Sequence, residues 1–295
     1  MILGSIEAGG TKFVCAVGDE NGVIKERVSF PTTTPEETMD KVVEFFRDKN
    51  IEAVGIGCFG PICLDKKSEE YGAITTTPKL LWQNYNIVKK IKDNFNIPVG
   101  FDTDVNAAAL GEYTWGAAKG LNSCLYMTVG TGIGAGIIAE GNLIHGLLHP
   151  EAGHMMICHE ERDLFEGACP FHKNCLEGMA SGPAIEKRWG KKPSELDSDH
   201  IGWDIEAHYL SVAIMDAILM ISPEKIILGG GVMKQSHLFP LIRKKVQERL
   251  NGYIKVPEIL ENIENYIVYP ELGDNAGICG GLALALRELK KWFGR

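Results

Sequence analysis

Two stretches of the chain, 120 residues apart, resemble each other, and this internal repeat limits the possible folds more than any other feature of the sequence. When SIEAGGTKFVCAVGDENGVI is aligned with LYMTVGTGIGAGIIAEGNLI, Gly10-Thr11 falls on Gly130-Thr131 and the later turns also coincide. Each stretch is typical of a hairpin of two strands with a Gly-Thr pair at its tip. The repeat therefore predicts an α/β fold of two similar lobes with a cleft between them.

The order of the predicted elements supports this duplication. In the first half, the Asn21-Gly22 turn joins two strands, and Thr34 followed by Pro35 is typical of the start of a helix. The other elements of this half are strands 2–8, 12–18, 23–30, 53–58 and 98–104 and helices near 87–95 and 105–116. After its hairpin, the second half continues with helix 204–221, strand 225–230, helix 238–250, strand 265–270 and helix 276–291. We expect the order βββαβαβα twice, with a smaller lobe over residues 1–118, a larger lobe over 119–295 and a last helix that could pack back on the first lobe.

The composition excludes several classes of protein. The 295 residues include 39 acidic and 30 basic side chains, a net charge of -9, so the chain lacks the basic surface of a nucleic-acid-binding protein. Its most apolar stretch, residues 124–139, is interrupted by threonines and glycines, whereas a membrane span needs about 20 predominantly apolar residues. The N-terminus lacks the pattern of a signal peptide. We therefore expect a cytoplasmic protein that binds neither nucleic acid nor membrane, and whose eight cysteines are thiols or metal ligands rather than disulfides.

The two Gly-Thr turns are candidate phosphate sites. Glycines have no Cβ and allow backbone N–H groups to approach phosphate oxygens, while threonine and lysine side chains add a hydroxyl and a positive charge. A tight hairpin without a ligand is the alternative explanation for the first turn. The second turn also matches the dinucleotide fingerprint GxGxxA, but a strand rather than a helix is predicted to follow it, which argues against a nicotinamide site.

The segment FDTDVNAAALGE places Asp102 and Asp104 where a predicted strand meets a predicted helix. Open α/β sheets bind ligands at this end of their strands. Asp104 could cap the helix, which is a common role for aspartate. It could also accept the proton of an attacking hydroxyl in phosphoryl transfer, with Mg²⁺ neutralising the phosphate oxygens of ATP. Asp104 is thus the candidate catalytic base.

A cluster of cysteine and histidine residues has the spacing of a metal site. Cys169, His172 and Cys175 form a C-x₂-H-x₂-C pattern, and His154 precedes them in the segment EAGH. Four such ligands suit zinc in a structural site, since no position is left open for water. Cys158 or His159 could replace His154 as the fourth ligand, and the alternative is a loop of thiols and imidazoles without metal.

Three further segments are candidates for ligand contacts. Glu151 and Glu177 flank the cysteine-histidine cluster. Carboxylates on a rigid loop suit hydrogen bonds to sugar hydroxyls. The alternative is that they are ordinary acidic residues on a solvated loop, which are common. The strand 226–229 ends in Gly229, Gly230 and Gly231, an arrangement that allows an adenosine to pack on backbone or that serves only as a turn. The helices 204–221 and 276–291 are expected to be core and interface packing.

Together these motifs resemble, in the same order and over nearly the whole chain, the ROK family of sugar kinases. The resemblance is greatest to its bacterial fructokinases, whose opening is similar to SIEAGGTKFVCAVG and whose zinc loop is similar to ACPFHKNCLEG. It implies an actin-like (ribonuclease H-like) ATPase fold that binds MgATP and a sugar, with Asp104 as the base. It implies ATP contacts at Gly9, Gly10, Thr11, Lys12, Gly130, Thr131, Gly132, Gly134, Gly229, Gly230 and Gly231. It implies sugar contacts at Glu151, His154, Glu177, Gly60, Pro61 and Thr103, structural zinc at His154, Cys169, His172 and Cys175, and a homodimer.

Two departures from most of the family favour fructose over glucose. The first is Glu7, where most members have aspartate, together with the C-x₂-H-x₂-C loop in place of C-x-C-G-x₂-G-C; both look like the fructokinase branch. The second is Thr103, which replaces an asparagine that many glucose-specific relatives place before the catalytic aspartate. We therefore predict phosphorylation of D-fructose at its 6-hydroxyl, with mannose, glucose or N-acetylmannosamine as alternative substrates. A non-catalytic sugar-binding or sensing protein is an alternative of another class. The DNA-binding repressors of the family carry a helix-turn-helix segment before the first hairpin, which begins here within ten residues of Met1.

Overall fold

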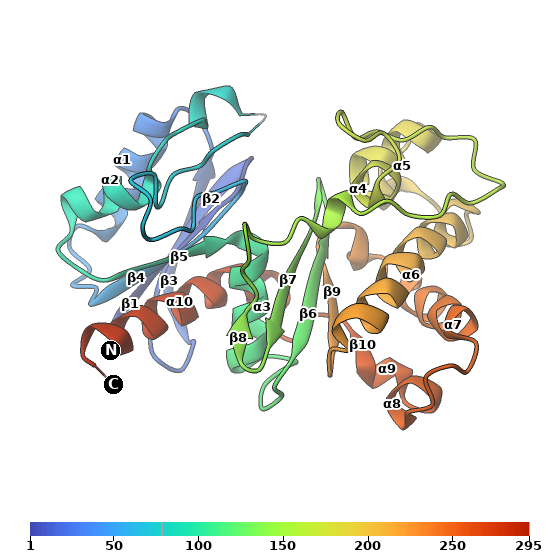
Figure 1. Cartoon of the computed structure of the whole chain (residues 1–295). Helices are drawn as coiled ribbons and strands as arrows, with labels where there is room; N and C mark the ends of the chain where they lie inside the picture. Colours follow the sequence, from blue (N-terminus) through green and yellow to red (C-terminus); the bar gives the residue numbers. More distant parts are fainter. Residues whose placement is uncertain (78, 295) are drawn as a thin grey trace. The chain divides into compact units, whose positions relative to one another are not determined.

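The computed structural model describes residues 1–77 and 79–294 and contains two five-stranded sheets with helices packed against them (Figure 1). The first sheet has the strand order β3-β2-β1-β4-β5. Its strands are β1 (Leu3–Ala8), β2 (Lys12–Gly18), β3 (Ile24–Pro31), β4 (Ala53–Cys58) and β5 (Val99–Thr103). β1 pairs with β2 and β2 with β3 antiparallel, whereas β1 and β4, and β4 and β5, are parallel. The hairpins and the later strands thus occur where the sequence predicts them.

Helices cover both faces of the first sheet, which explains why β4 is buried along its whole length. α1 (Pro35–Phe46) and α2 (Ile87–Asn94) pack on one face, and α3 (Asp104–Trp115) and α10 (Ala276–Trp292) pack on the other (Figure 1). Thr34 caps α1 as predicted, because its Oγ1 accepts a hydrogen bond from the Glu37 N–H at 3.3 Å. α3 and α10 lie so close together that a Cβ on Gly280 would overlap the Ala107 carbonyl.

The second sheet has the strand order β10-β9-β6-β7-β8. Its strands are β6 (Cys124–Val129), β7 (Ile133–Ala139), β8 (Asn142–Leu143), β9 (Ile226–Gly229) and β10 (Ile267–Val268). The helices of this part are α4 (Leu176–Ala180), α5 (Gly182–Trp189), α6 (Gly202–Ile221), α7 (Leu238–Leu250), α8 (Pro257–Leu260) and α9 (Ile263–Tyr266). Short 3₁₀ helices are η1 (Leu80–Trp82), η2 (Ala152–His154), η3 (Pro193–Glu195), η4 (Val232–Lys234) and η5 (Gly273–Asn275).

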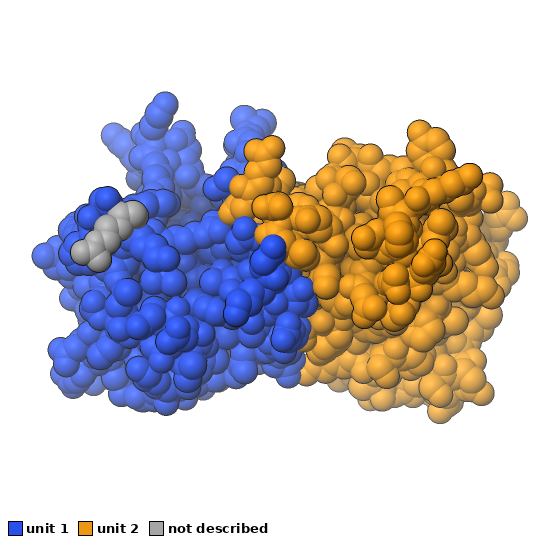
Figure 2. Space-filling model, turned by 90° about the horizontal axis from the view of Figure 1, so that it is seen from below, with its two compact units in different colours: residues 1–120, 142–149, 271–295 blue, residues 121–141, 150–270 orange. Residues whose placement is uncertain are grey.

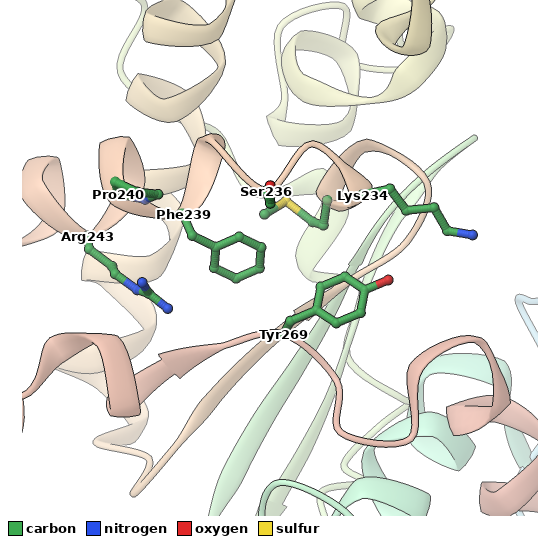
Figure 3. Close-up of a pocket in the computed structure, with 7 residues that line it drawn as sticks. Lys234, Ser236, Phe239, Pro240, Arg243 and Tyr269 are labelled. Atoms are coloured by element: carbon green, nitrogen blue, oxygen red, sulfur yellow. The ribbon is translucent and has the colours of Figure 1, made fainter. Parts of the chain in front are cut away.

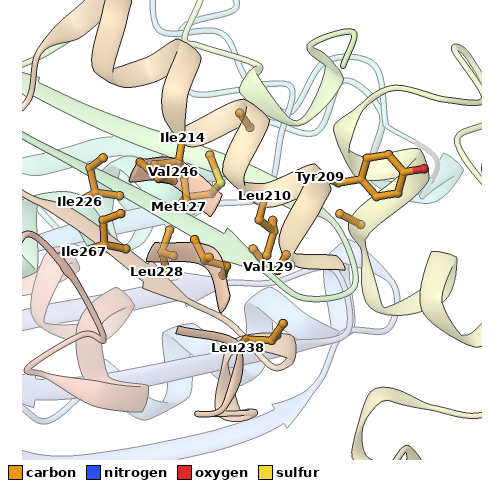
Figure 4. Packing of buried hydrophobic residues seen from close by; sticks show 14 of the residues in the cluster. Met127, Val129, Tyr209, Leu210, Ile214, Ile226, Leu228, Leu238, Val246 and Ile267 are labelled. Atoms are coloured by element: carbon orange, nitrogen blue, oxygen red, sulfur yellow. The ribbon is translucent and has the colours of Figure 1, made fainter. Parts of the chain in front are cut away.

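α6 and α7 bury their apolar sides against the second sheet, and Figure 4 shows this core. Met127 and Leu228 from the strands lie among Ile214 of α6 and Val246 of α7, all fully buried. Both helices agree with the prediction from apolar spacing. The predicted strand 265–270 is correct only in its centre, because Tyr266 belongs to α9 and donates its hydroxyl hydrogen to the Pro223 carbonyl at 2.9 Å.

The chain groups into two compact units, coloured in Figure 2. Unit 1 comprises residues 1–120, 142–149 and 271–295, and unit 2 comprises residues 121–141 and 150–270. α10 belongs to unit 1, where it packs on α3, β1 and β4. Within the described residues, no helix is long and apolar enough to cross a membrane.

Candidate active site and metal centre

Three parallel strands of unit 1 end at the same edge of their sheet. Ala8 at the end of β1 pairs with Cys58 at the end of β4, and Cys58 pairs with Thr103 at the end of β5. The residues that follow are Gly9, Phe59 and Asp104, and each begins a turn or helix at this edge. The first glycine turn, the Gly60-Pro61 segment and Asp104, all predicted site residues, thus begin at neighbouring positions.

Asp104 is the first residue of α3, and its neighbour Thr103 is the N-cap. The Thr103 Oγ1 accepts a hydrogen bond from the Asn106 N–H at 3.1 Å, so the interpretation of Asp104 as the capping residue is wrong. Asp104 Oδ1 accepts the N–H of Val105 at 2.9 Å, and the helix dipole favours a negative charge at this position. Burial and the charge of Asp104 raise the pKa of the neighbouring Cys58 thiol well above its usual range. Asp104 therefore suits the role of a carboxylate base at a helix start.

The first Gly-Thr turn is a tight hairpin fixed by the strand beside it. The Gly9 N–H donates to the Lys12 carbonyl at 3.0 Å, and Thr32, directly after β3, donates its hydroxyl hydrogen to the Gly9 carbonyl at 2.7 Å. Thr11 and Lys12 are exposed at the tip. The tight hairpin is therefore confirmed, and it leaves the Thr11 and Lys12 side chains exposed at its tip, where phosphate binding stays a prediction.

Lys79 lies beside this turn, and no sequence motif predicted it. Its Cε would be 3.2 Å from a Cβ added to Gly10. The chain brings it there from a segment without a recognisable phosphate motif, so proximity to the turn is its only signal. Lys79 adds a second positive charge near the tip of the first hairpin.

Glu7, the residue that distinguishes this chain from most of the family it resembles, lies on β1 two residues before the turn. Burial raises the pKa of its carboxyl, while Lys12 and Arg27 oppose this effect. A Cβ on Gly277 would lie 2.9 Å from the Glu7 carboxyl carbon, so the longer side chain of glutamate is accommodated by a glycine of α10.

The second Gly-Thr turn, in unit 2, is held by a carboxylate. The Ile133 N–H donates to Glu177 Oε2 at 2.9 Å, and a Cβ on Gly132 would approach the same oxygen to 2.7 Å. The Gly130 carbonyl accepts the N–H of Gly182 at 2.8 Å, at the start of α5. Glu177, predicted as a sugar ligand, is thus placed by the structure against the turn that is predicted to bind phosphate.

η2 brings Glu151 and His154 to the same turn. Gly153 of η2 packs so tightly that a Cβ there would overlap the Ile133 carbonyl. Glu151 is exposed just before η2, and His154 is half-buried at its end. Gly130, Thr131, Gly132, Glu151, His154 and Glu177 are therefore grouped in one part of unit 2.

His154, Cys169, His172 and Cys175 form a four-ligand cluster beside this group. Each offers one ligand atom, and these atoms lie within 4.8 Å of one another. His154 Nδ1 is 3.5 Å from Cys175 Sγ and 3.8 Å from Cys169 Sγ, and His172 Nδ1 is 3.8 Å from Cys169 Sγ. Zinc bonds of about 2.3 Å to sulfur and 2.0–2.1 Å to nitrogen place tetrahedral ligand atoms about 3.6 Å apart. The donor set and spacing therefore fit a four-coordinate metal ion of this size.

The alternative fourth ligands are not part of the cluster. Cys158 is exposed, and both ring nitrogens of His159 lie near carbonyls, those of Glu160 and Phe165, at 3.0 and 3.1 Å. Burial raises the pKa of the Cys175 thiol to about 11, so a metal ion that binds here displaces a proton.

Gly229 ends β9, and Gly230 and Gly231 connect it to η4, whose Met233 and Lys234 line an open cavity of ≈ 480 Å³ (Figure 3). Its walls include Phe239 and Tyr269, whose ring centroids are 6.2 Å apart in an edge-on arrangement. The Arg243 guanidinium lies 5.3 Å from the Phe239 ring centre and donates to the Ile267 carbonyl at 2.7 Å. Lys234 and Ser236 complete the polar part of the wall. An aromatic and cationic cavity of this kind suits a flat, negatively charged ligand.

The predicted site residues therefore form two groups, one in each unit. Unit 1 holds Asp104, Thr103, Gly60, Pro61 and the first turn, and unit 2 holds the second turn, the two glutamates, the metal cluster and the three glycines. Besides Lys79, the sequence did not predict two histidines that lie next to the unit 1 group. His145 contacts Asp102, directly before Thr103, and His149 contacts Ile62, directly after Pro61.

Comparisons with known proteins identify the family of this chain. Residues 3–288 match the sequence profile of the ROK family. A fructokinase from Pediococcus pentosaceus is 48% identical over 290 residues, covering 98% of this chain and 99% of that protein. A fructokinase from Zymomonas mobilis subsp. mobilis is 45% identical over 299 residues, covering 98% of each. The solved structure of a ROK hexokinase from Thermus thermophilus is similar with a TM-score of 0.78 at 26% identity, covering 99% of this chain and 100% of that one.

Proposed function

The chain belongs to the ROK family, and from that premise we propose that it transfers the γ-phosphoryl group of ATP to the 6-hydroxyl of a hexose, with D-fructose as its preferred substrate. The observation that carries this proposal is the position of Asp104. It begins α3 at the strand edge where the first glycine turn and the Gly60-Pro61 segment also begin. In this proposal, neighbouring strand ends thus supply both the base for the sugar hydroxyl and a turn for phosphate. The fructokinase names of relatives at 45% and 48% identity support fructose.

In this proposal Asp104 accepts the proton of the sugar hydroxyl as that oxygen attacks the γ-phosphorus. The bond from the γ-phosphorus to the β,γ-bridging oxygen breaks, and ADP leaves with that oxygen. The backbone N–H groups of the two Gly-Thr turns, with Thr11, Lys12 and Thr131, would hold the phosphates, and Mg²⁺ supplied with ATP would neutralise phosphate charge. Gly60, Pro61, Thr103, Glu151, His154 and Glu177 are the proposed sugar contacts.

The cavity beside η4 is the proposed site of adenine. Phe239 and Tyr269 offer two aromatic surfaces in its wall, against which a flat base can pack. Gly229, Gly230 and Gly231 leave backbone accessible next to these rings. The adjoining turn at Gly130 then receives the phosphates.

The cysteine-histidine cluster is proposed to hold a structural zinc ion. His154, Cys169, His172 and Cys175 would supply all four ligands, which leaves no position for a reacting water. The ion would fix the loop that carries Glu151 and Glu177. We also propose a homodimer in the cytoplasm, as expected for the family. Light scattering of the purified protein tests the dimer.

The test of the proposed function is coupled ADP release with MgATP and, in turn, fructose, glucose, mannose and N-acetylmannosamine. We expect the highest kcat/KM for fructose. Asp104→Asn should lower kcat by about 10²–10⁴-fold with an unchanged Tm. Asp93→Asn, on the exposed surface of α2, is the matched control.

Three outcomes would contradict parts of the proposal. A higher kcat/KM for another hexose would overturn fructose as the substrate but leave the kinase reaction. Full activity of Asp104→Asn would overturn its role as base. No turnover with any sugar, together with measurable sugar binding, would favour a sugar-binding protein.

A further inference from the structure

Segment 145–149 of unit 1 carries two histidines that contact two different turns of the proposed sugar site. Gly146 and Leu148 close a tight turn between them, with the Gly146 N–H 2.9 Å from the Leu148 carbonyl. His145 is 39% exposed and His149 is buried. None of the sequence motifs includes either residue.

His145 contacts the junction of β5 and α3. Its Nε2 lies 2.8 Å from Asp102 Oδ2, and Asp102 is only 3% exposed. The other oxygen, Oδ1, accepts the N–H of Thr103 at 2.9 Å and the side-chain N–H of Asn106 at 2.7 Å. Thr103 caps α3, and Asp104 is the next residue. The Asp102 carboxylate therefore joins His145 to the backbone that aims the proposed base.

His149 contacts the other turn. Its Nε2 accepts the N–H of Ile62 at 3.2 Å, directly after Gly60-Pro61. The His149 ring also lies 3.4 Å from the place of a Cβ on Gly60. For Nε2 to accept this hydrogen bond, the ring proton must be on Nδ1.

We propose that His145 and His149 are positioning residues. Their hydrogen bonds join segment 145–149 to the β5–α3 junction, which carries Asp104, and to the Gly60-Pro61 turn, and hold both in the geometry needed for phosphoryl transfer. This inference rests on the proposed kinase function. His145 acts on the base and is expected to affect kcat. His149 acts on the sugar-binding turn and is expected to affect the KM for fructose.

The contact between His145 and Asp102 depends on pH. The hydrogen bond to Asp102 raises the pKa of His145, and burial opposes it. The charged pair is therefore fully present at low pH and is lost as pH rises through this raised value. The other charged or titratable groups shown to interact with Asp102 are Tyr71 and Arg287; Tyr71 in turn interacts with Glu288, and Arg287 with Tyr113.

The test compares His145→Ala with His145→Gln, whose amide N–H can reach Asp102 but cannot titrate. We expect His145→Ala to lower kcat by about 10–100-fold with a KM for fructose within about threefold, since a misplaced reacting group costs about this much. The wild-type kcat should decline as pH rises through the pKa of His145, because the charged pair with Asp102 is lost. His145→Gln should recover kcat to within about threefold at neutral pH and should not show this decline. His149→Leu should raise the KM for fructose by about tenfold or more. His200→Gln, just before α6 and in unit 2, is the matched control.

Several results would overturn the inference. A kcat of His145→Ala within twofold of wild type would do so, as would a His145→Gln variant that keeps the wild-type pH profile. An increase in KM alone in both His145 variants would make His145 a sugar contact instead. If His145→Ala does not fold, as judged from its Tm, the pH profile of His145→Gln decides. Wild-type turnover and inactive Asp104→Asn separate failure of this inference from failure of the proposed function.

Discussion

Glu112 is a fully buried carboxylate on α3 that accepts three backbone hydrogen bonds, and its removal should destabilise unit 1 strongly. Its oxygens accept the N–H groups of Ala117 at 2.8 Å, Leu272 at 2.9 Å and Glu271 at 3.1 Å. Ala117 lies just after α3, and Glu271 and Leu272 lie where the chain returns to unit 1 before α10. One side chain thus satisfies backbone from two segments that are far apart in the sequence.

The expected magnitude follows from these contacts. Each buried N–H left without an acceptor costs about 1–3 kcal/mol. Because water can enter part of the vacated space, we expect Glu112→Ala to lower the free energy of unfolding by about 3–5 kcal/mol, near the low end of the sum. At about 2–4 °C per kcal/mol this corresponds to a Tm lower by roughly 6–20 °C.

Two variants make the experiment specific. Glu112→Gln keeps an oxygen that can accept two of the three hydrogen bonds but turns an amide toward the third N–H, so we expect a smaller loss of about 1–3 kcal/mol. Glu44→Ala, which removes an exposed carboxylate from α1, should change stability by less than about 1 kcal/mol. The assay is urea unfolding followed by circular dichroism, with Tm from thermal scans. A Glu112→Ala protein within about 1 kcal/mol of wild type would refute the reasoning.

Three other changes test the sites in unit 2. Cys175→Ser should remove bound zinc, measured by elemental analysis, and lower the Tm by about 4 °C or more. Cys158→Ser, at an exposed cysteine, should keep the zinc content and the Tm of wild type. A full complement of zinc in Cys175→Ser would exclude Cys175 as a ligand. Tyr269→Ala should raise the KM for ATP by about 2–10-fold, because about 0.5–1.5 kcal/mol of aromatic contact is lost, and should leave the KM for fructose unchanged. An unchanged KM for ATP would show that adenine does not bind in this cavity. Glu177→Ala, which removes the acceptor of the Ile133 N–H, should raise the KM for ATP, measured by coupled ADP release; a change in the KM for fructose alone would show that Glu177 acts only on the sugar.

Local signals in the sequence were sufficient for most of the fold. The Asn21-Gly22 turn and the Thr34 cap act over a few residues, so their patterns predict the structure directly. The alternative that Asp104 caps α3 is wrong, since Thr103 is the N-cap. Both residues are good N-cap residues, and the sequence does not show which of them is the last residue outside the helix. β10 is shorter than predicted because Tyr266 is held by the distant Pro223 carbonyl.

The supporting contacts of the sites could not be predicted in the same way. His145 and Asp102 are separated by 43 residues, and His149 and Ile62 by 87. A histidine in a polar loop belongs to no periodic pattern in the sequence. Its hydrogen-bond partner can be identified only when the three-dimensional positions of the loop and the sheet are known. Glu112 is similar, since a glutamate in a helix is usually exposed and only the tertiary fold buries it.

The metal cluster and the second Gly-Thr turn are connected through a single short helix. Cys175 precedes α4 and Glu177 is its second residue, so the ligand that would bind the metal and the carboxylate that holds the Ile133 N–H are two residues apart. The Leu176 N–H also donates to the Met155 carbonyl at 2.9 Å, which joins α4 to the residue after His154. A metal ion bound at Cys175 and His154 would therefore fix the position of Glu177 from both sides. It follows that loss of the metal should loosen the phosphate turn as Glu177→Ala does. Cys175→Ser and Glu177→Ala should then raise the KM for ATP to a similar extent, and the double variant should be little worse than either one alone.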